Sequence, residues 1–203
     1  MEVAALITAF ATLFVVIDPI GLTPMFVALT QGMSARERMA IAVRATLIAI
    51  FILTLFGLFG ESVLGFIGIS MPAFRIAGGI LLFITALDML FERRSKRRED
   101  QAVDRPDPSV FPLALPLIAG PGAIATMILL TGQSADMAGL FAVHLVMIAT
   151  IGLAFLMFLS AGYLEHLLGK TGINVVTRLL GMLLAALSVQ FVVDGILDLI
   201  AMS

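Results

Sequence analysis

The stretch that decides the fold is FVVIDPIG, residues 14–21, in an apolar run from about Val3 to Leu29. Asp18 is the only charged residue of that run. A carboxylate at the centre of a bilayer costs roughly 2.5–3.5 kcal/mol, and Pro19 removes a backbone donor at the next position. Broken backbone inside a membrane is tolerated only where protein or a water-filled cavity covers it. A charge and a break in one span therefore predict a functional site at this position.

The composition places the chain in a membrane, because it is 61% hydrophobic and only 13% charged. Soluble domains are usually about 25% charged. A helix crosses a bilayer with about 20 apolar residues, and six stretches are long enough: 3–29, 40–60, 72–91, 111–131, 138–160 and 175–200. Outer-membrane barrels are excluded, because their strands alternate apolar and polar residues. We therefore expect an all-α membrane protein with six transmembrane helices, in which segment 61–71 is a re-entrant turn or the start of the third span.

Basic residues set the expected orientation. Nine of them lie in the loops after the first, third and fifth spans: Arg36, Arg38, Arg93, Arg94, Lys96, Arg97, Arg98, Arg105 and Lys170. The positive-inside rule places these loops in the cytoplasm, so both termini are predicted to be periplasmic or extracellular. The charged segment 92–110 is expected to be a solvated cytoplasmic linker, with contact between residues 93–98 and anionic lipid as the alternative. The lipid bilayer is thus the expected partner, and nucleic acid is not, because no soluble domain accompanies the basic cluster.

The two halves of the chain resemble each other. Asp18-Pro19 aligns with Gly120-Pro121 at an offset of 102 residues, and both dipeptides lie near the middle of a span. Residues 75–78 (RIAG) align with residues 178–181 (RLLG) at an offset of 103. Three spans per half is an odd number, so the second half enters the membrane from the opposite side. The sequence therefore predicts a 3+3 inverted repeat of residues 1–91 and 111–203, with the first and fourth helices broken. Paired breaks of this kind point to a transporter's binding site.

The two predicted breaks offer complementary chemistry. Asp18 is a good N-cap and Pro19 suits the first helical position, so each span reads as two half-helices. A helix N-terminus carries roughly +0.5 of a charge, and at Gly120 no side chain satisfies it, so an external carboxylate could bind there. Asp18 could receive a cation, a proton or an ammonium group, and together the breaks suit a small zwitterion. The alternatives are a structural cap at Asp18 that pairs with a buried arginine, and close helix packing by the small residues 120–122.

Other polar residues are candidates for a gate or for coupling. Arg75 and Arg178 lie near span ends, where basic side chains usually extend to the interface; gating or pairing with an aspartate is the alternative. Gln190 lies deeper in the sixth span, where a helix–helix hydrogen bond explains it as well as solute contact does, and Asp194 fits an outer interfacial position. His144 is expected at the outer interface rather than in a proton relay. Three threonines are expected to satisfy backbone groups around the breaks: Thr23, Thr126 and Thr131.

Residues 14–24 (FVVIDPIGLTP) and 116–126 (PLIAGPGAIAT) resemble the MarC family of bacterial and archaeal integral membrane proteins. The length, the six spans and the charged central linker fit that family as well. The resemblance implies an inner-membrane protein with a 3+3 inverted repeat. Archaeal relatives transport small neutral amino acids such as glycine and alanine, whereas many bacterial members have no assigned substrate. The matching family positions, which the resemblance implies as substrate-binding, are Asp18, Pro19, Gly21, Pro24, Gly120, Pro121 and Gly122.

The sequence favours a secondary transporter of a small solute, most simply a small neutral amino acid, that works by alternating access at the two breaks. Coupling to a proton or ion gradient is expected, because the chain has no ATP-binding motif. The alternative is a non-transporting membrane subunit or assembly factor, which tight, solute-free packing at both breaks would favour. An intramembrane enzyme would need a convergent acid–base or metal set, and the sequence offers none; the chain has no Cys, and no cofactor or metal is expected.

Overall fold

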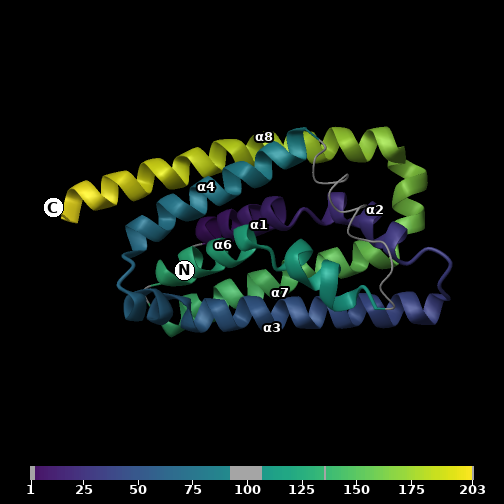
Figure 1. The fold of residues 1–203 in the computed structure, drawn as a ribbon, viewed down its shortest axis with the longest axis horizontal. Helices are drawn as coiled ribbons and strands as arrows, with labels where there is room; N and C mark the ends of the chain where they lie inside the picture. The colour runs from purple at the N-terminus through teal and green to yellow at the C-terminus, as the bar shows by residue number, and fades with distance from the viewer. Residues whose placement is uncertain (1–2, 92–106, 135, 203) are drawn as a thin grey trace.

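A computed structural model describes residues 3–91, 107–134 and 136–202, and every regular element in these ranges is helical. The elements are α1 (Val3–Ile17), α2 (Pro19–Leu29), α3 (Ala35–Ile67), α4 (Met71–Leu90), η1 (Ser109–Ile118), α6 (Pro121–Gly132), α7 (Met137–Leu159) and α8 (Ala161–Met202) (Figure 1). Five segments are long and apolar enough to cross a membrane, and the bent pair of η1 and α6 makes a sixth. The expected all-α membrane fold is confirmed at this level. The cluster at residues 93–98 lies outside the described residues.

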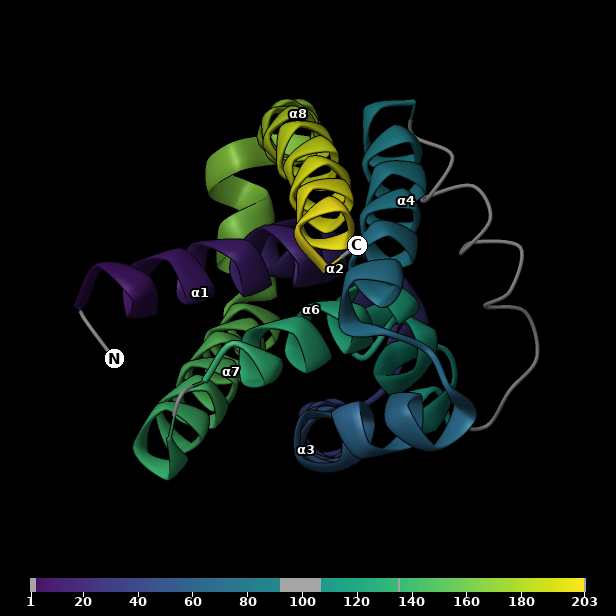
Figure 2. The same ribbon diagram turned by 90° about the vertical axis from the view of Figure 1, so that its left-hand side faces the viewer.

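The helices form three layers. Figures 1 and 2 show α4 and α8 side by side on one face, α3 and α7 on the opposite face, and α1, α2 and α6 between them. The middle layer is well buried: Ile17, Leu22, Phe26 and Met127 are each at most 1% exposed. The interrupted helices therefore lie where neighbouring helices cover them, which is the condition that broken backbone in a membrane requires.

Local sequence sets the ends of α3. Ser34 and Glu37 form a capping box, in which the Ser34 hydroxyl accepts from the Glu37 N–H and the Glu37 carboxylate accepts from the Ser34 N–H. The helix ends at Gly68, whose φ of 84° is a left-handed conformation that favours glycine. The expectation for segment 61–71 is wrong, because α3 continues to Ile67. Glycines are tolerated in this apolar helix where they allow close packing, as Gly60 does against Ile128 of α6.

Glycine also brings α4 and α8 together. A Cβ on Gly79 would lie 2.8 Å from the carbonyl oxygen of Ser188, and a Cβ on Gly195 would lie 2.9 Å from that of Pro72. Both positions therefore require glycine for the observed approach, as in other close helix pairs of membrane proteins. At Gly169 the backbone has φ 62° and ψ 171°, so α8 changes direction there, and its apolar span runs from Thr171 to Met202.

Candidate functional site

The first span is interrupted at a single residue. Asp18 separates α1 from α2 and has φ 54° and ψ 63°, the left-handed conformation that Asp adopts more readily than most residues. Its side chain is buried, and its Oδ1 accepts a hydrogen bond from the Gly21 N–H at 3.0 Å. Pro19 occupies the first turn of α2. Asp18 is thus the N-cap of α2, although α1 and α2 together remain one apolar span.

Gly21 and Asp18 form one structural unit. A Cβ on Gly21 would overlap the Oδ2 atom of Asp18, so only glycine leaves room for this carboxylate. Pro24 lies one turn further along α2 and is half-buried. It removes the backbone donor that would otherwise bond to the carbonyl of Ile20. The backbone of the break between α1 and α2 therefore explains why Asp18, Gly21 and Pro24 stand in the first motif.

The second break is longer and less regular. η1 contains non-helical conformations at Phe111, Leu115 and Pro116, and it meets α6 at an angle of 54°. The prediction of two regular half-helices is therefore wrong for the first half of this span, because Pro112 and Pro116 each remove a backbone donor. Gly120 precedes α6, where a Cβ would lie 2.5 Å from the carbonyl oxygen of Pro116.

The N-terminus of α6 has no side-chain cap. Pro121, which is exposed, has no N–H, so the first backbone donors of α6 are those of Gly122 and Ala123, and both residues are buried. The first N–H groups of a helix have no partner within the helix. This end of α6 therefore presents the donor-rich, electropositive environment that favours an anionic group.

The two breaks lie side by side. Val16 comes two residues before Asp18, and its Cγ1 atom is 3.5 Å from the position of a Cβ on Gly122. A Leu82 methyl group of α4 lies 2.9 Å from the same position, and the Thr85 hydroxyl lies 3.8 Å from it. Helices α1, α4 and α6 therefore converge at Gly122. This is the close packing by small residues that the sequence left open as an alternative.

Thr126 is a polar residue of this region whose environment the sequence did not reveal. Its hydroxyl is fully buried and has no hydrogen-bond partner. Thr23 and Thr131 instead donate to the carbonyls of Pro19 and Met127, at 2.9 and 2.8 Å. The expectation of backbone satisfaction is thus right for these two and wrong for Thr126. Its spacing of four residues from Gly122, which puts both on one helix face, is the signal that could have identified it.

The gate or coupling candidates lie on α4 and α8. Arg75 Nη1 pairs with Asp198 Oδ2 at 2.5 Å, and this ion pair joins the two helices. Of the two readings of Arg75, the structure therefore shows the one in which it pairs with an aspartate. Gln190 donates to Asp194 at 2.7 Å, so this hydrogen bond lies within α8 and does not join two helices. Arg178 lies on α8 with an exposed side chain. Asp198 was not among the candidates from the sequence, which therefore missed its role in joining α4 to α8.

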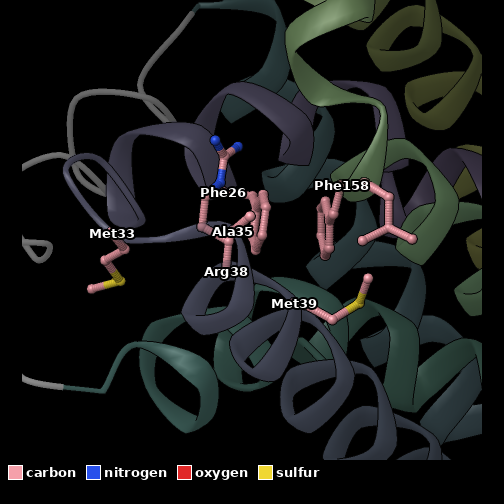
Figure 3. A pocket seen from close by; sticks show the side chains of 7 residues that line it. Phe26, Met33, Ala35, Arg38, Met39 and Phe158 are labelled. Atoms are coloured by element: carbon pink, nitrogen blue, oxygen red, sulfur yellow. The ribbon is translucent and has the colours of Figure 1, made fainter.

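A cavity of about 340 Å³ opens where α2, the start of α3 and the end of α7 meet. The rings of Phe26 and Phe158 face each other there, with centroids 4.7 Å apart and planes inclined by 11° (Figure 3). The Arg38 guanidinium lies 5.7 Å from the Phe26 centroid, within reach of a cation–π interaction. A second cavity, of about 320 Å³, lies between α3, α4 and α6, and Phe56, Pro121 and Ile128 are among the residues that line it.

Asp107 and Arg44 form an exposed ion pair at the surface. Asp107 pairs with Arg44 at 2.6 Å and accepts a hydrogen bond from the Ser109 N–H at 3.0 Å. Hydrogen bonding to Ser109, and then the charge of Arg44, lower the pKa of Asp107. Among the residues that the structure describes, no three His, Asp or Glu side chains lie close enough together to hold a metal ion.

Comparison with known proteins identifies the family. The model of the MarC family integral membrane proteins matches residues 3–200. A UPF0056 membrane protein of Methanocaldococcus jannaschii is 38% identical over 200 residues, which cover 97% of this chain and 98% of the relative. The Bacillus subtilis protein YvbG is 37% identical over 202 residues, with coverage of 97% and 96%. The Escherichia coli protein YhgN, named an inner membrane protein, is 34% identical over 193 residues, with coverage of 94% and 95%.

These matches extend over nearly the whole chain, and the names of the relatives carry no substrate. No solved structure matches the chain. With its apolar helices and its two motifs at Asp18 and Gly120, the chain is a multi-pass integral membrane protein that belongs to the MarC family.

Proposed function

We propose that this protein is a secondary transporter of a small neutral amino acid, which binds between the two breaks and crosses the membrane by alternating access. The observation that carries the proposal is the adjacency of the breaks, which Val16 and Gly122 bring together. One break holds the buried carboxylate of Asp18, and the other holds the uncapped N-terminus of α6. A zwitterion presents the two opposite charges that such a pair of groups would bind.

The pattern of helix contacts supports an inverted repeat. Exchanging α1 and α2 with η1 and α6, α3 with α7, and α4 with α8 maps the principal contacts onto one another. α2 packs on α7 and α8, as α6 packs on α3 and α4; α1 packs on α7, as η1 packs on α3. The pairs α3–α7 and α4–α8 map onto themselves. Secondary transporters with inverted repeats bind their solute at the interface between the repeats.

The positions of the two cavities also support an inverted repeat. Phe26 and Phe158 line the first cavity, and Ile128 and Phe56 line the second. Ile128 follows Phe26, and Phe158 follows Phe56, by the offset of 102 residues that relates the two breaks. We assign the stacked pair to the cytoplasmic closure of the solute pathway, because Arg38, one of the basic residues that favour a cytoplasmic position, borders it at the start of α3. The contacts between α3 and α6 would then close the opposite side.

In the proposed binding mode, the solute's ammonium group meets Asp18 and its carboxylate meets the first N–H groups of α6. The unpartnered hydroxyl of Thr126 supplies a further hydrogen bond to the solute. Val16 and Leu82 pack closely at Gly122, so solute entry requires these contacts to separate. Rocking of one repeat against the other would provide that movement, with a proton or ion gradient as the energy source.

Counterflow in proteoliposomes tests this function directly. Vesicles preloaded with unlabelled solute are presented with a panel of labelled amino acids, and glycine or alanine is expected to accumulate transiently. Thr126→Val removes the unpartnered hydroxyl with little change in shape and should reduce this exchange several-fold. Thr131→Val is the matched control, because its hydroxyl already bonds to Met127. Absence of exchange across the panel by folded wild-type protein would refute the transport proposal.

A non-transporting membrane subunit is the second candidate function, and the tight packing of Gly122 against Leu82 favours it. In that case the breaks serve only to shape the helix bundle. Such a protein would show no counterflow, and Gly122→Ala would change its stability without changing any solute flux. Co-purification of a defined membrane partner from native membranes would then support the subunit role.

The proposal includes the orientation of the chain in the membrane. The nine basic residues support a cytoplasmic position for residues 92–108 and an outside position for both termini. A reporter fused after Ser203 should behave as periplasmic, and a reporter inserted in residues 92–108 should behave as cytoplasmic. The opposite pattern of reporter activity would reverse the assignment of the two cavities to the two sides of the membrane.

A further inference from the structure

His144 is buried within α7, with 8% of its surface exposed. The sequence predicted a position near the outer interface and did not predict this burial, which comes from α3 and α6. A Cβ on Gly57 of α3 would lie 2.8 Å from His144 Nε2 and 3.0 Å from the terminal methyl group of Met127 of α6. The absence of a side chain at Gly57 therefore makes the space that the imidazole occupies.

Only one of the two ring nitrogens of His144 has a hydrogen-bond partner. His144 Nδ1 lies 2.8 Å from the carbonyl oxygen of Leu140, and because a carbonyl only accepts, Nδ1 carries the hydrogen. Nε2 of the neutral ring is then a bare acceptor, and it is buried without a hydrogen-bond partner. Buried polar atoms without a partner are uncommon in native structures, and each calls for an explanation.

We propose that His144 Nε2 is the binding site for the proton that drives transport. This inference deepens the proposed transport function and rests on it. The Nε2 lone pair takes up a proton, and the ring becomes an imidazolium cation; release of the same proton restores the neutral ring. A histidine ring is the side chain that most commonly exchanges protons near neutral pH.

Protonation of His144 Nε2 is unfavourable in the packing that the structure shows around the ring. The new N–H would point into a buried position that offers no acceptor, so the charged ring favours an arrangement in which α3 or α6 has moved. A ligand shifts a conformational equilibrium only through different affinities for the two states, and here the ligand is the proton. Met127 borders His144 on the half-helix that starts at Gly120, so the same movement reaches the second break.

The charged groups of the surrounding helices are few. On α3, Glu61 lies one turn beyond Gly57 and is exposed, whereas the four other charged residues lie near the opposite end: Arg36, Glu37, Arg38 and Arg44. Residues 121–132 of α6 carry no charge. Asp18 lies between α1 and α2, and Asp136 caps α7. The described charged side chains of α8 are Arg178, Asp194 and Asp198. Of the charged residues of α3, Glu61 is therefore the one nearest in sequence to Gly57.

Gradient-driven uptake tests the proton site in the full-length protein. In proteoliposomes with an imposed inward proton gradient, His144→Gln should reduce accumulation of labelled glycine or alanine at least tenfold. It should leave counterflow without a gradient within about twofold of wild type. His166→Gln is the matched control, since the chain has two histidines, and it should behave as wild type. A His144→Gln variant that accumulates solute with the wild-type dependence on the gradient would overturn the proposal.

A second measurement needs no transport and no variant at His144. In ¹⁵N-histidine NMR spectra of the His166→Gln protein in lipid nanodiscs, the single remaining ring should show a bare Nε2 when it is neutral. Its protonation on acidification should shift the methyl signal of Met127. A neutral ring with its hydrogen on Nε2, or a ring that stays neutral at every pH at which the protein is folded, would refute the proton site. Absence of wild-type counterflow refutes transport instead, so the two failures are distinguishable.

Discussion

Val16 of α1 packs against the backbone of α6 at Gly122, with its Cγ1 atom 3.5 Å from the position that a Cβ on Gly122 would occupy. This contact joins two segments that are separated by about half of the chain. It places the carboxylate-bearing break near the break that has only backbone donors. A Cβ at the same position would also lie 2.9 Å from a methyl group of Leu82 on a third helix. A side chain at position 122 would therefore have to displace the Leu82 side chain at the point where the two breaks approach each other.

Gly21→Ala should destabilise the protein, because the added Cβ overlaps the Asp18 carboxylate and displaces the cap of α2. Loss of an N-cap typically costs about 0.5–2 kcal/mol, and we expect the upper half of that range. Gly139→Ala is the matched control, because Gly139 also donates its N–H to an aspartate cap, Asp136, and a Cβ there would lie 3.1 Å from that carboxylate. Thermal unfolding in detergent micelles measures both variants. An equal loss in the two would contradict the special fit at Gly21.

The ion pair between Arg75 and Asp198 should contribute more to stability than the surface pair between Arg44 and Asp107. The Arg75 side chain is 16% exposed, whereas that of Arg44 is 54% exposed. A double-mutant cycle with Arg75→Gln and Asp198→Asn is expected to give a coupling energy of about 1–2 kcal/mol. The cycle for the surface pair should give less than about 1 kcal/mol. A larger coupling energy for the surface pair would contradict the argument that the lower exposure of Arg75 strengthens its ion pair.

The Arg44–Asp107 pair should stabilise the protein only when Asp107 is ionised. The folded-state pKa of Asp107 is lowered by hydrogen bonding to Ser109 and by Arg44. This contribution is therefore present above the unfolded-state pKa and is lost as the pH falls through the lowered folded-state value. The melting temperature of wild type should exceed that of Asp107→Asn at about pH 7, and the difference should shrink as the pH falls below 3.8, the ordinary pKa of an aspartate, and through the lowered folded-state pKa. A difference that is independent of pH would exclude the carboxylate charge as its source.

Much of the fold could be predicted from the sequence, because apolar runs locate membrane spans and local signals locate helix starts. The N-cap at Asp18 followed from its own side chain and from Pro19. The length of α3 could not be predicted, because a glycine in an apolar run reads equally well as a turn or as a packing position. The irregular backbone of η1 arises from Pro112 and Pro116 acting together, where the sequence suggested one simple break at Gly120.

The environments of single polar residues depend on partners that are distant in sequence. Arg75 and Asp198 lie on different helices, and no local pattern joins them. His144 is buried because Gly57 leaves space for its ring, and that relation is not visible within α7 alone. Thr126 differs from Thr23 and Thr131 in that its hydroxyl has no hydrogen-bond partner. These three positions required the tertiary structure.

Gly122→Leu should abolish solute exchange while leaving Asp18 in place, because the leucine side chain fills the point where α1, α4 and α6 converge. Gly65→Leu is a matched control, since a Cβ at Gly65 on α3 meets no atom within 4 Å. Counterflow by purified, monodisperse protein measures both variants. Exchange at the wild-type rate by Gly122→Leu would remove the second break from the solute pathway.

The most direct test of the central claim is counterflow by Asp18→Asn beside Asp136→Asn. Both residues cap a helix and accept from a glycine N–H three residues later, and asparagine preserves capping in both cases. If Asp18 meets the solute's ammonium group, its variant loses a charge-assisted contact worth roughly 1.5–3 kcal/mol. Exchange of glycine or alanine should then fall about 10- to 100-fold, while Asp136→Asn exchanges at the wild-type rate. Wild-type exchange by folded Asp18→Asn would contradict the proposed site.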